Sequence, residues 1–161
     1  MSETERLLTI FFVPGAWHTP WVFDSVRSIL SARGFETDAA ALATAGSSDP
    51  DIGLHDDAAK VRSALTKLID DGKEVLVLAH SYGGIVASNA VKGLSTTQRT
   101  ADGLKGGISM VVYLAAFTIP ANTSLVMAAG HSSFGGDQGP PDWWIISEVR
   151  VSLSLMTVAG D

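Results

Sequence analysis

One serine stands where an apolar run gives way to two glycines. The stretch "VLVLAHSYGG" carries Ser81, with Ala79 two positions before it, Gly83 two positions after it, and Gly84 next. A G-x-S-x-G pattern is typical of a nucleophile elbow, a sharp strand-to-helix turn that exposes a serine oxygen above a sheet. Only small residues fit beside such a turn, and Ala79 in place of the first glycine still meets that requirement. The pattern predicts that Ser81 is a nucleophile; a buried turn without chemistry is the alternative.

A second stretch has the composition of a turn that binds negative charge. An apolar run ends at Pro14 and Gly15, and the small Ala16 follows. Attack by a serine puts negative charge on a substrate oxygen, which backbone N–H groups stabilise. One donor comes from the residue after the nucleophile and one from an early strand-to-helix loop, so Tyr82 and Ala16 are the expected donors. Taken alone, the loop is a plain Pro-Gly turn; beside the serine turn, the functional interpretation is favoured.

A serine nucleophile also needs a histidine base and an acid that orients the base. In the chain order that accompanies this turn (serine, acid, histidine), only Asp102 and His131 qualify after Ser81. Asp102 precedes a strand predicted at residues 108–115. Eight strand residues at about 3.3 Å each place Asp102 roughly 26 Å from the edge that carries Ser81. This pair is therefore excluded as the rest of a triad.

The other histidines are weaker candidates for the base. His80 adjoins Ser81, but neighbouring strand residues point to opposite sides, so His80 is expected to pack behind the turn. His18 follows the first apolar run and is expected to be a loop or pocket-wall residue, whereas His55 begins an exposed helix turn. A Ser–His dyad that uses His18 or His131 remains the alternative.

Alternating strands and helices must position these residues. Apolar runs predict strands at residues 7–15, 35–42, 74–80 and 107–116, and helical spacing predicts helices at residues 20–33, 54–70 and 82–94. This order predicts a three-layer α/β/α fold with a mostly parallel sheet. In such a sheet, functional residues gather at the carboxyl ends of the strands. The loop at residues 14–18, Ser81 and the residues from Phe117 onward all fall on that edge.

The composition restricts the partners. With 161 residues, 46% of them hydrophobic and 17% charged, the chain suits one domain with a core. A net charge of −6 without a basic run argues against nucleic acid. No apolar stretch approaches the roughly 20 residues of a membrane span. The acidic start argues against a secretory signal, so a cytoplasmic location is expected.

No cofactor or metal is expected. The chain has no cysteine, which excludes disulfides, thiol nucleophiles and cysteine-bound zinc. Its four histidines lie far apart without i,i+4 pairing. Neither a dinucleotide-binding G-x-G-x-x-G nor a phosphate-binding G-x-x-x-x-G-K is present. The expected partner is a small-molecule acyl substrate.

Three segments resemble the α/β-hydrolase superfamily: "FFVPGAWHTPWVF", "VLVLAHSYGG" and "MVVYLAAFTIP". The resemblance is to the AB hydrolase-1 domain proteins of fungi and bacteria, which are similar to plant methylesterases and hydroxynitrile lyases. It implies an esterase-like serine hydrolase that acts on a carboxylic ester or related acyl substrate. It also implies that Ser81 is the nucleophile and that Ala16 and Tyr82 form the oxyanion hole. Pro14 departs from the family, which usually carries histidine there.

The same resemblance divides the chain. Residues 1–120 are expected to form the N-terminal part of an α/β-hydrolase core, and residues 121–161 the start of a cap over the pocket. Trp143 and Trp144, together with Trp17 and His18, are expected to line that pocket. In the family the acid and the histidine of the triad follow two further strands. We therefore expect the C-terminal part of the fold to be missing and the chain to be weakly active or inactive.

Two other functions stay open. One is a pseudoenzyme on the same fold that binds a small molecule without catalysis, and the other is a C–C lyase of the hydroxynitrile lyase type. The strand at residues 108–115 is expected to be an uncovered apolar sheet edge, through which the chain would self-associate.

Overall fold

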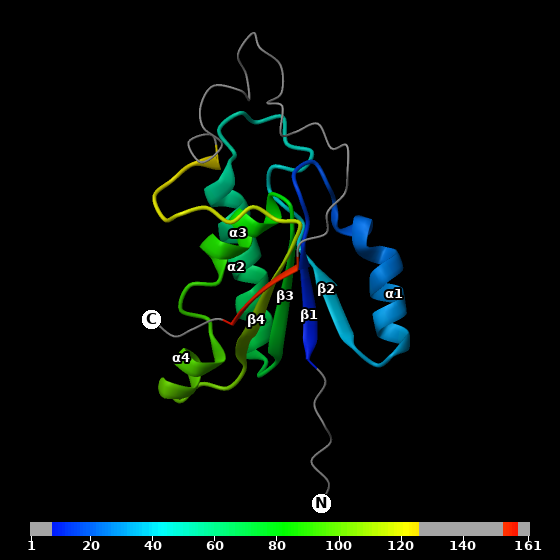
Figure 1. Ribbon diagram of the computed structural model, residues 1–161, viewed down its shortest axis with the longest axis vertical. Helices are drawn as coiled ribbons and strands as arrows, with labels where there is room; N and C mark the ends of the chain where they lie inside the picture. Colours follow the sequence, from blue (N-terminus) through cyan, green and yellow to red (C-terminus); the bar gives the residue numbers. More distant parts are fainter. Residues whose placement is uncertain (1–7, 126–152, 158–161) are drawn as a thin grey trace, which may run out of the picture.

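The computed structural model of the protein describes residues 8–125 and the backbone of residues 153–157. Its centre is a five-stranded sheet in the order β2-β1-β3-β4-β5 (Figure 1). The strands are β1 (Thr9–Val13), β2 (Glu36–Ala39), β3 (Glu74–His80), β4 (Gly107–Leu114) and β5 (Leu153–Thr157). The first four strands are parallel, and β5 is antiparallel to β4. The mostly parallel sheet that the apolar runs predict is confirmed.

Helices cover both faces of the sheet. The 3-10 turn η1 (Pro20–Phe23) and α1 (Asp24–Ala32) lie on one face, and α2 (Leu54–Asp70) and α3 (Gly83–Ala90) lie on the other (Figure 1). A short helix, α4 (Thr96–Ala101), precedes β4. This arrangement confirms the predicted α/β/α layers. Within residues 8–125, no helix combines the length and apolar character that crossing a membrane requires.

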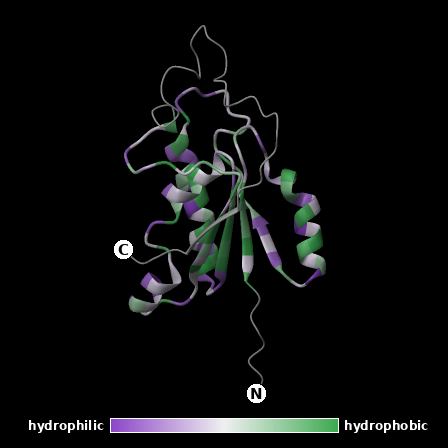
Figure 2. Ribbon diagram, in the orientation of Figure 1, coloured by the Kyte–Doolittle hydropathy of each residue, from purple (hydrophilic) through white to green (hydrophobic). Residues whose placement is uncertain are grey.

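The core lies between the sheet and helices α2 and α3. Most of its buried members come from three strands and these two helices, among them Phe11, Val13, Val61, Leu65, Ile69, Val75, Val77, Ala79, Val86, Ala87 and Val111. In Figure 2 the central strands are hydrophobic, whereas β2 at the sheet edge is largely hydrophilic. Charged and polar residues are what a solvent-exposed edge strand needs.

The apolar stripe of α1 is exposed, in contrast to that of α2. Val26 and Ile29 on α1 are 40% and 55% exposed, Val22 in the preceding turn η1 is 42% exposed, and α1 has no buried residue. The preceding turn is attached to the sheet by Phe23, whose ring centroid lies 4.8 Å from that of Phe12. Periodicity predicts which face of a helix is apolar but not which element covers it. Within residues 8–125, no element buries this stripe.

Strand β4 is not a sheet edge, and the prediction of an uncovered apolar edge at residues 108–115 is wrong. β5 pairs with it, with Met110 opposite Thr157 and Leu114 opposite Leu153. β5 falls within the 121–161 segment expected to begin a cap, yet it is a strand of the main sheet. The apolar and polar residues alternate at residues 151–155 (VSLSL), which is a local signal for a strand, but no local pattern identifies β4 as the partner.

Helix α3 is shorter than predicted, and periodicity does not indicate α4. α3 ends at Ala90, and the chain turns at Gly93, where φ is +73°. Ser95 caps α4, because its Oγ accepts a hydrogen bond from the Gln98 N–H at 3.2 Å. A serine three residues before a glutamine is the spacing of a capping box. The sequence therefore does contain a local signal for α4.

A buried arginine on α4 joins the loops at the amino edge of the sheet. Arg99 is 7% exposed. Its guanidinium donates hydrogen bonds to the carbonyls of Ile69 (3.3 Å), Lys105 (3.0 Å) and Gly106 (3.2 Å), and to the Asp70 carboxylate (2.8 Å). The five donors of a guanidinium suit such a cluster of acceptors. Arg99 thereby connects α4 to the end of α2 and to the loop before β4.

Candidate active site

Backbone strain gathers at the carboxyl edge of the sheet. Ser81, directly after β3, has a φ of +53°, and Ala115, directly after β4, has a φ of +43°. Trp17, in the loop after β1, has a φ of +62°. Residues with a side chain rarely adopt positive φ; each such conformation costs on the order of 1–3 kcal/mol and persists only where the surrounding structure holds it. The structure therefore holds Ser81 in an unfavourable conformation at this edge.

Two glycines at the start of α3 allow the helix to approach its neighbours closely. A Cβ added to Gly83 would lie 2.5 Å from the carbonyl oxygen of Val13 and 2.6 Å from that of Pro14. A Cβ added to Gly84 would lie 2.5 Å from the carbonyl oxygen of Phe117. Only glycine fits at such contacts. The loops after β1 and β4 are thus packed directly against the residues that follow Ser81.

Ser81 itself contacts both of these loops. A Cβ added to Gly15 would lie 3.1 Å from the Ser81 Cβ and 3.5 Å from its Oγ, so the first loop passes beside the serine side chain. The Phe117 N–H donates a hydrogen bond to the Ser81 carbonyl at 3.0 Å. The structure therefore brings together the three segments whose motifs stand out in the sequence. Ala79, at the end of β3, is fully buried beneath the turn.

The backbone around the serine leaves two amide groups available. The His18 N–H donates to the Gly15 carbonyl at 3.3 Å, which closes a turn with Ala16 and Trp17 at its centre. A positive φ at the third residue of such a turn is the type II pattern. Tyr82 stands at the N-cap position of α3, where backbone N–H groups lack helical acceptors. No described residue accepts a hydrogen bond from the N–H of Ala16 or Tyr82.

Two imidazoles lie near each other at this edge. The rings of His18 and His80 are nearly perpendicular, with centroids 6.3 Å apart. His18 Nδ1 forms a hydrogen bond with the Ala16 carbonyl at 2.8 Å, and His80 Nδ1 would be 3.2 Å from a Cβ on Gly15. Burial lowers the pKa of His80, and the charge of His18 lowers it further. Within the described residues, neither ring is hydrogen-bonded to Ser81.

A buried carboxylate lies behind the turn and was not predicted. Asp57 on α2 is fully buried. Its Oδ1 accepts a hydrogen bond from the Thr44 N–H at 2.9 Å, and its Oδ2 accepts from the Thr44 hydroxyl at 2.8 Å and from the Tyr82 hydroxyl at 2.9 Å. Burial raises the pKa of Tyr82 well above its usual range, and the hydrogen bond to Asp57 and its negative charge add to the rise.

The sequence did contain a signal for this network. Leu54, Ala58 and Val61 define the apolar stripe of α2, and Asp57 stands on the same stripe, three residues after Leu54. A carboxylate on a buried helical face requires hydrogen-bond partners. Its position therefore predicts a buried polar network, although not the identity of its partners.

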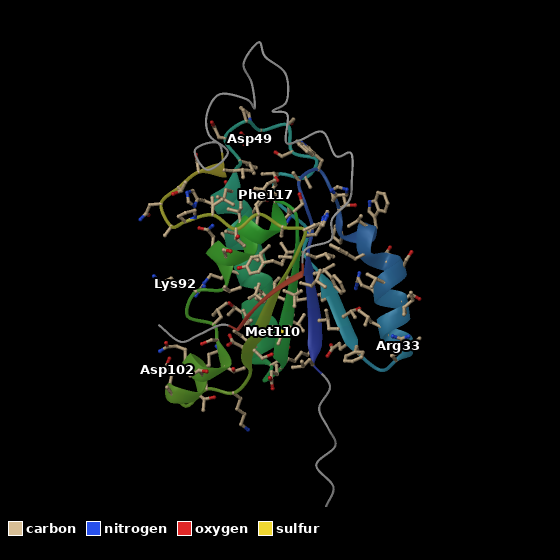
Figure 3. All side chains as sticks on the ribbon, viewed as in Figure 1. Arg33, Asp49, Lys92, Asp102, Met110 and Phe117 are labelled. Carbon is tan, nitrogen blue, oxygen red and sulfur yellow. The ribbon has the colours of Figure 1, made fainter. Side chains whose placement is uncertain are left out.

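The remaining candidate residues lie elsewhere or outside the described residues. In Figure 3 Asp102 and Phe117 lie at opposite ends of the strands, and Phe117 is hydrogen-bonded to Ser81, so Asp102 lies far from the serine, as the strand length predicts. The Trp17 side chain is 86% exposed, and His18 is exposed beside it. Trp143, Trp144 and His131 lie outside the described residues. Within those described, no three His, Asp or Glu side chains gather as a metal site requires.

The fold and the strained serine turn define a class of protein, and comparison with known proteins agrees with it. A model of the alpha/beta hydrolase family matches residues 10–157. The chain is 32% identical over 116 residues to the alpha/beta hydrolase nvfD of Aspergillus novofumigatus, and 30% identical over 132 residues to a probable hydrolase of a Phoma species. The chain belongs to the alpha/beta hydrolase family.

These matches extend over most of this chain but only part of each relative. They cover 72% and 81% of this chain, and 46% and 49% of the two relatives, so the chain spans about half the length of the curated relatives it matches.

Two solved structures share the fold. One is an extracellular alpha/beta-hydrolase from a Paenibacillus species, described as similar to tobacco salicylic acid binding protein 2, with a TM-score of 0.55 at 23% identity. The other is tomato methylketone synthase I, with a TM-score of 0.56 at 18% identity. The matches cover 70% and 76% of this chain, and 42% and 45% of those structures.

Proposed function

We propose that this chain carries the nucleophile and the oxyanion hole of a serine hydrolase that acts on a carboxylic ester or a related acyl substrate. The observation that supports the proposal most is the conformation of Ser81. The residue is held at a φ of +53° between β3 and α3, with Gly15 packed beside its side chain. A strained serine between a strand and a helix is the arrangement of a nucleophile elbow.

The two available amides support the same reaction. In the proposed mechanism, Ser81 Oγ attacks the acyl carbon of the substrate and transfers its proton to a base, while the N–H groups of Ala16 and Tyr82 stabilise the oxyanion. Collapse of the tetrahedral intermediate releases the protonated alcohol and leaves an acyl ester on Ser81. Water then hydrolyses this ester, which returns the serine and releases the acid.

The base is the part that the described residues do not supply. Neither His18 nor His80 is hydrogen-bonded to Ser81 within them. Without the base, a serine hydrolase loses on the order of a million-fold in turnover. An oxyanion hole and binding without the triad still accelerate a reaction by roughly 10³–10⁴ over water. We therefore propose that the 161-residue chain acts slowly, and that the base and its acid belong to sequence outside residues 8–125.

Hydrolysis of p-nitrophenyl acetate by the purified chain tests the proposal. The expected result is slow release of p-nitrophenol above the buffer rate, together with an acetyl adduct on Ser81 that intact mass detects and that Ser81→Ala lacks. Ser63→Ala, a substitution of an exposed serine on α2, is the matched control and should form the adduct like the wild type. An equal amount of adduct on Ser81→Ala would contradict the proposal.

One observation favours a second candidate, a pseudoenzyme that binds a small molecule without catalysis. This observation is the absence, within the described residues, of an imidazole hydrogen-bonded to Ser81. The second candidate predicts that ligand binding is unaffected by Ser81→Ala and that no acyl adduct forms on the serine.

A further inference from the structure

We propose that Asp57 is a positioning residue for the serine turn: it holds the hydroxyl of Tyr82 and thereby fixes the backbone N–H that follows Ser81. The proposal rests on the proposed function, because that N–H matters only if it binds an oxyanion. Asp57 is assigned no contact with the substrate.

The geometry gives Asp57 two anchors. Its carboxylate is fully buried and accepts hydrogen bonds from the N–H and hydroxyl of Thr44, which follows β2, and from the hydroxyl of Tyr82, which follows β3. A buried carboxylate is stable only when its oxygens are hydrogen-bonded. The Thr44 bonds satisfy and orient the carboxylate, and the Tyr82 bond connects it to the turn.

Of the residues in the serine turn, Tyr82 is the one whose side chain can hold the turn in place. Gly83 and Gly84 have no side chain, and the hydroxyl of Ser81 must stay free to react. A residue at positive φ returns to a relaxed conformation unless its neighbours hold it. The half-buried ring of Tyr82 packs against the core, and its hydroxyl ends on Asp57. Besides the backbone hydrogen bond from Phe117 to Ser81, this side-chain hydrogen bond therefore anchors the turn.

The chemistry of the pair keeps the anchor in place across the usual pH range. Burial and the neighbouring carboxylate raise the pKa of Tyr82, so its hydroxyl stays protonated and remains a donor. Asp57 is unsuited to be the acid of a triad. Both of its oxygens already accept hydrogen bonds, and within the described residues none of its partners is an imidazole.

Three substitutions in the full chain test the proposal. Tyr82→Phe and Thr44→Val each remove one hydroxyl from the same oxygen, Asp57 Oδ2, at similar distances of 2.9 and 2.8 Å, so they are matched. Asp57→Asn removes the negative charge of the carboxylate to which both hydroxyls donate. The measured quantity is the rate at which a fluorophosphonate probe labels Ser81, followed by intact mass. We expect about tenfold slower labelling in Tyr82→Phe and Asp57→Asn, and less than a twofold change in Thr44→Val.

A double variant separates positioning from general destabilisation. If Asp57 acts through Tyr82, the combination of Asp57→Asn and Tyr82→Phe labels no more slowly than the slower single variant. The proposal would be overturned if Thr44→Val and Tyr82→Phe slowed the labelling of Ser81 equally, or if Tyr82→Phe left the labelling rate unchanged. If Asp57→Asn does not fold, the comparison of Tyr82→Phe with Thr44→Val still tests the proposal.

Hydrogen exchange decides the case in which the wild-type chain is not labelled at all. That outcome rejects the proposed function, whereas exchange at the amides of Gly84, Ile85 and Phe117, which donate to the carbonyls of Ser81 and Tyr82, reports on the anchor without any reaction. Faster exchange there in Tyr82→Phe but not in Thr44→Val would support a role for Asp57 in holding the turn. Unchanged exchange in Tyr82→Phe would reject that role.

Discussion

Among the described residues, one buried charge lies at the amino ends of the strands and one at their carboxyl ends, and the two charges have different partners. At the amino edge, Arg99 donates to three backbone carbonyls and to the carboxylate of Asp70. At the carboxyl edge, Asp57 accepts from Thr44 and from the tyrosine beside Ser81. Arg99 ties loops to one another, whereas Asp57 ties a loop to the turn that carries a reactive side chain.

The backbone differs between the edges in the same way. At the amino edge, positive φ falls on glycines, Gly106 at +68° and Gly107 at +154°, which adopt it at little cost. In the described residues, positive φ at residues other than glycine is confined to the loops that follow β1, β3 and β4. Turns without backbone strain are typical of a structural role, whereas a strained backbone that its surroundings hold in place is typical of a functional site. The comparison makes a general prediction: changes at the carboxyl edge should alter reactivity, and changes at the amino edge should alter stability alone.

The largest effect is expected at Gly83. In Gly83→Ala the new Cβ would lie 2.5 Å from the Val13 carbonyl oxygen, so α3 must move away from β1. We expect a loss of about 3 kcal/mol in the free energy of unfolding by urea, with loss of Ser81 labelling. Gly53→Ala is the control, because a Cβ there has nothing within 4 Å; it should cost about 1 kcal/mol or less. If Gly83→Ala were as stable as Gly53→Ala, the claim that only glycine fits beside the Val13 carbonyl would be wrong.

A loss of stability without a change in reactivity is expected at Arg99. In Arg99→Met the carbonyls of Lys105 and Gly106 and the Asp70 carboxylate lose the hydrogen bonds that the buried guanidinium donates, which costs about 2–3 kcal/mol. Urea unfolding checks this value. The rate of Ser81 labelling per folded molecule should stay within twofold of the wild-type rate. A tenfold slower rate in folded Arg99→Met would contradict the division of roles between the edges.

A smaller, pH-dependent effect is expected at His80. Its pKa is lowered in the folded protein, chiefly by burial, so the unfolded chain binds a proton more readily than the folded chain. Stability is then full above the ordinary histidine pKa of about 6.5 and falls as the pH drops through that value toward the folded pKa. Urea unfolding at a series of pH values should show this fall in the wild type and a flatter profile in His80→Asn. His55→Asn, at an exposed site, should keep the wild-type profile; a flatter profile there too would refute the assignment to His80.

Much of the fold follows from local sequence, and the exceptions have physical reasons. β1, β3 and β4 are buried on both faces or nearly so, and therefore read as continuous apolar runs. The apolar stripe of α2 predicts the helix, and the structure buries that stripe in the core. The stripe of α1 looks the same in the sequence, yet Val26 and Ile29 are exposed, since the pattern does not say what covers a face. The alternating sequence at residues 151–155 indicates a strand, but its pairing with β4 is non-local and leaves no signal in the sequence.

The candidate site divides in the same way. Ser81, Gly83 and Gly84 could be identified because the turn has a fixed spacing of small residues. The contacts that hold the turn could not, because Thr44, Asp57 and Tyr82 come from three separate segments. Asp57 had a readable signal as a carboxylate on a buried stripe, but only the structure identifies Tyr82 as its partner.

Peptide mapping of the fluorophosphonate adduct identifies the residue that reacts. One adduct is expected on the wild-type chain, carried by Ser81, and no adduct on Ser81→Ala under the same conditions. Ser63→Ala should be labelled like the wild type. An adduct on another residue, or equal labelling of the wild type and Ser81→Ala, would contradict the account.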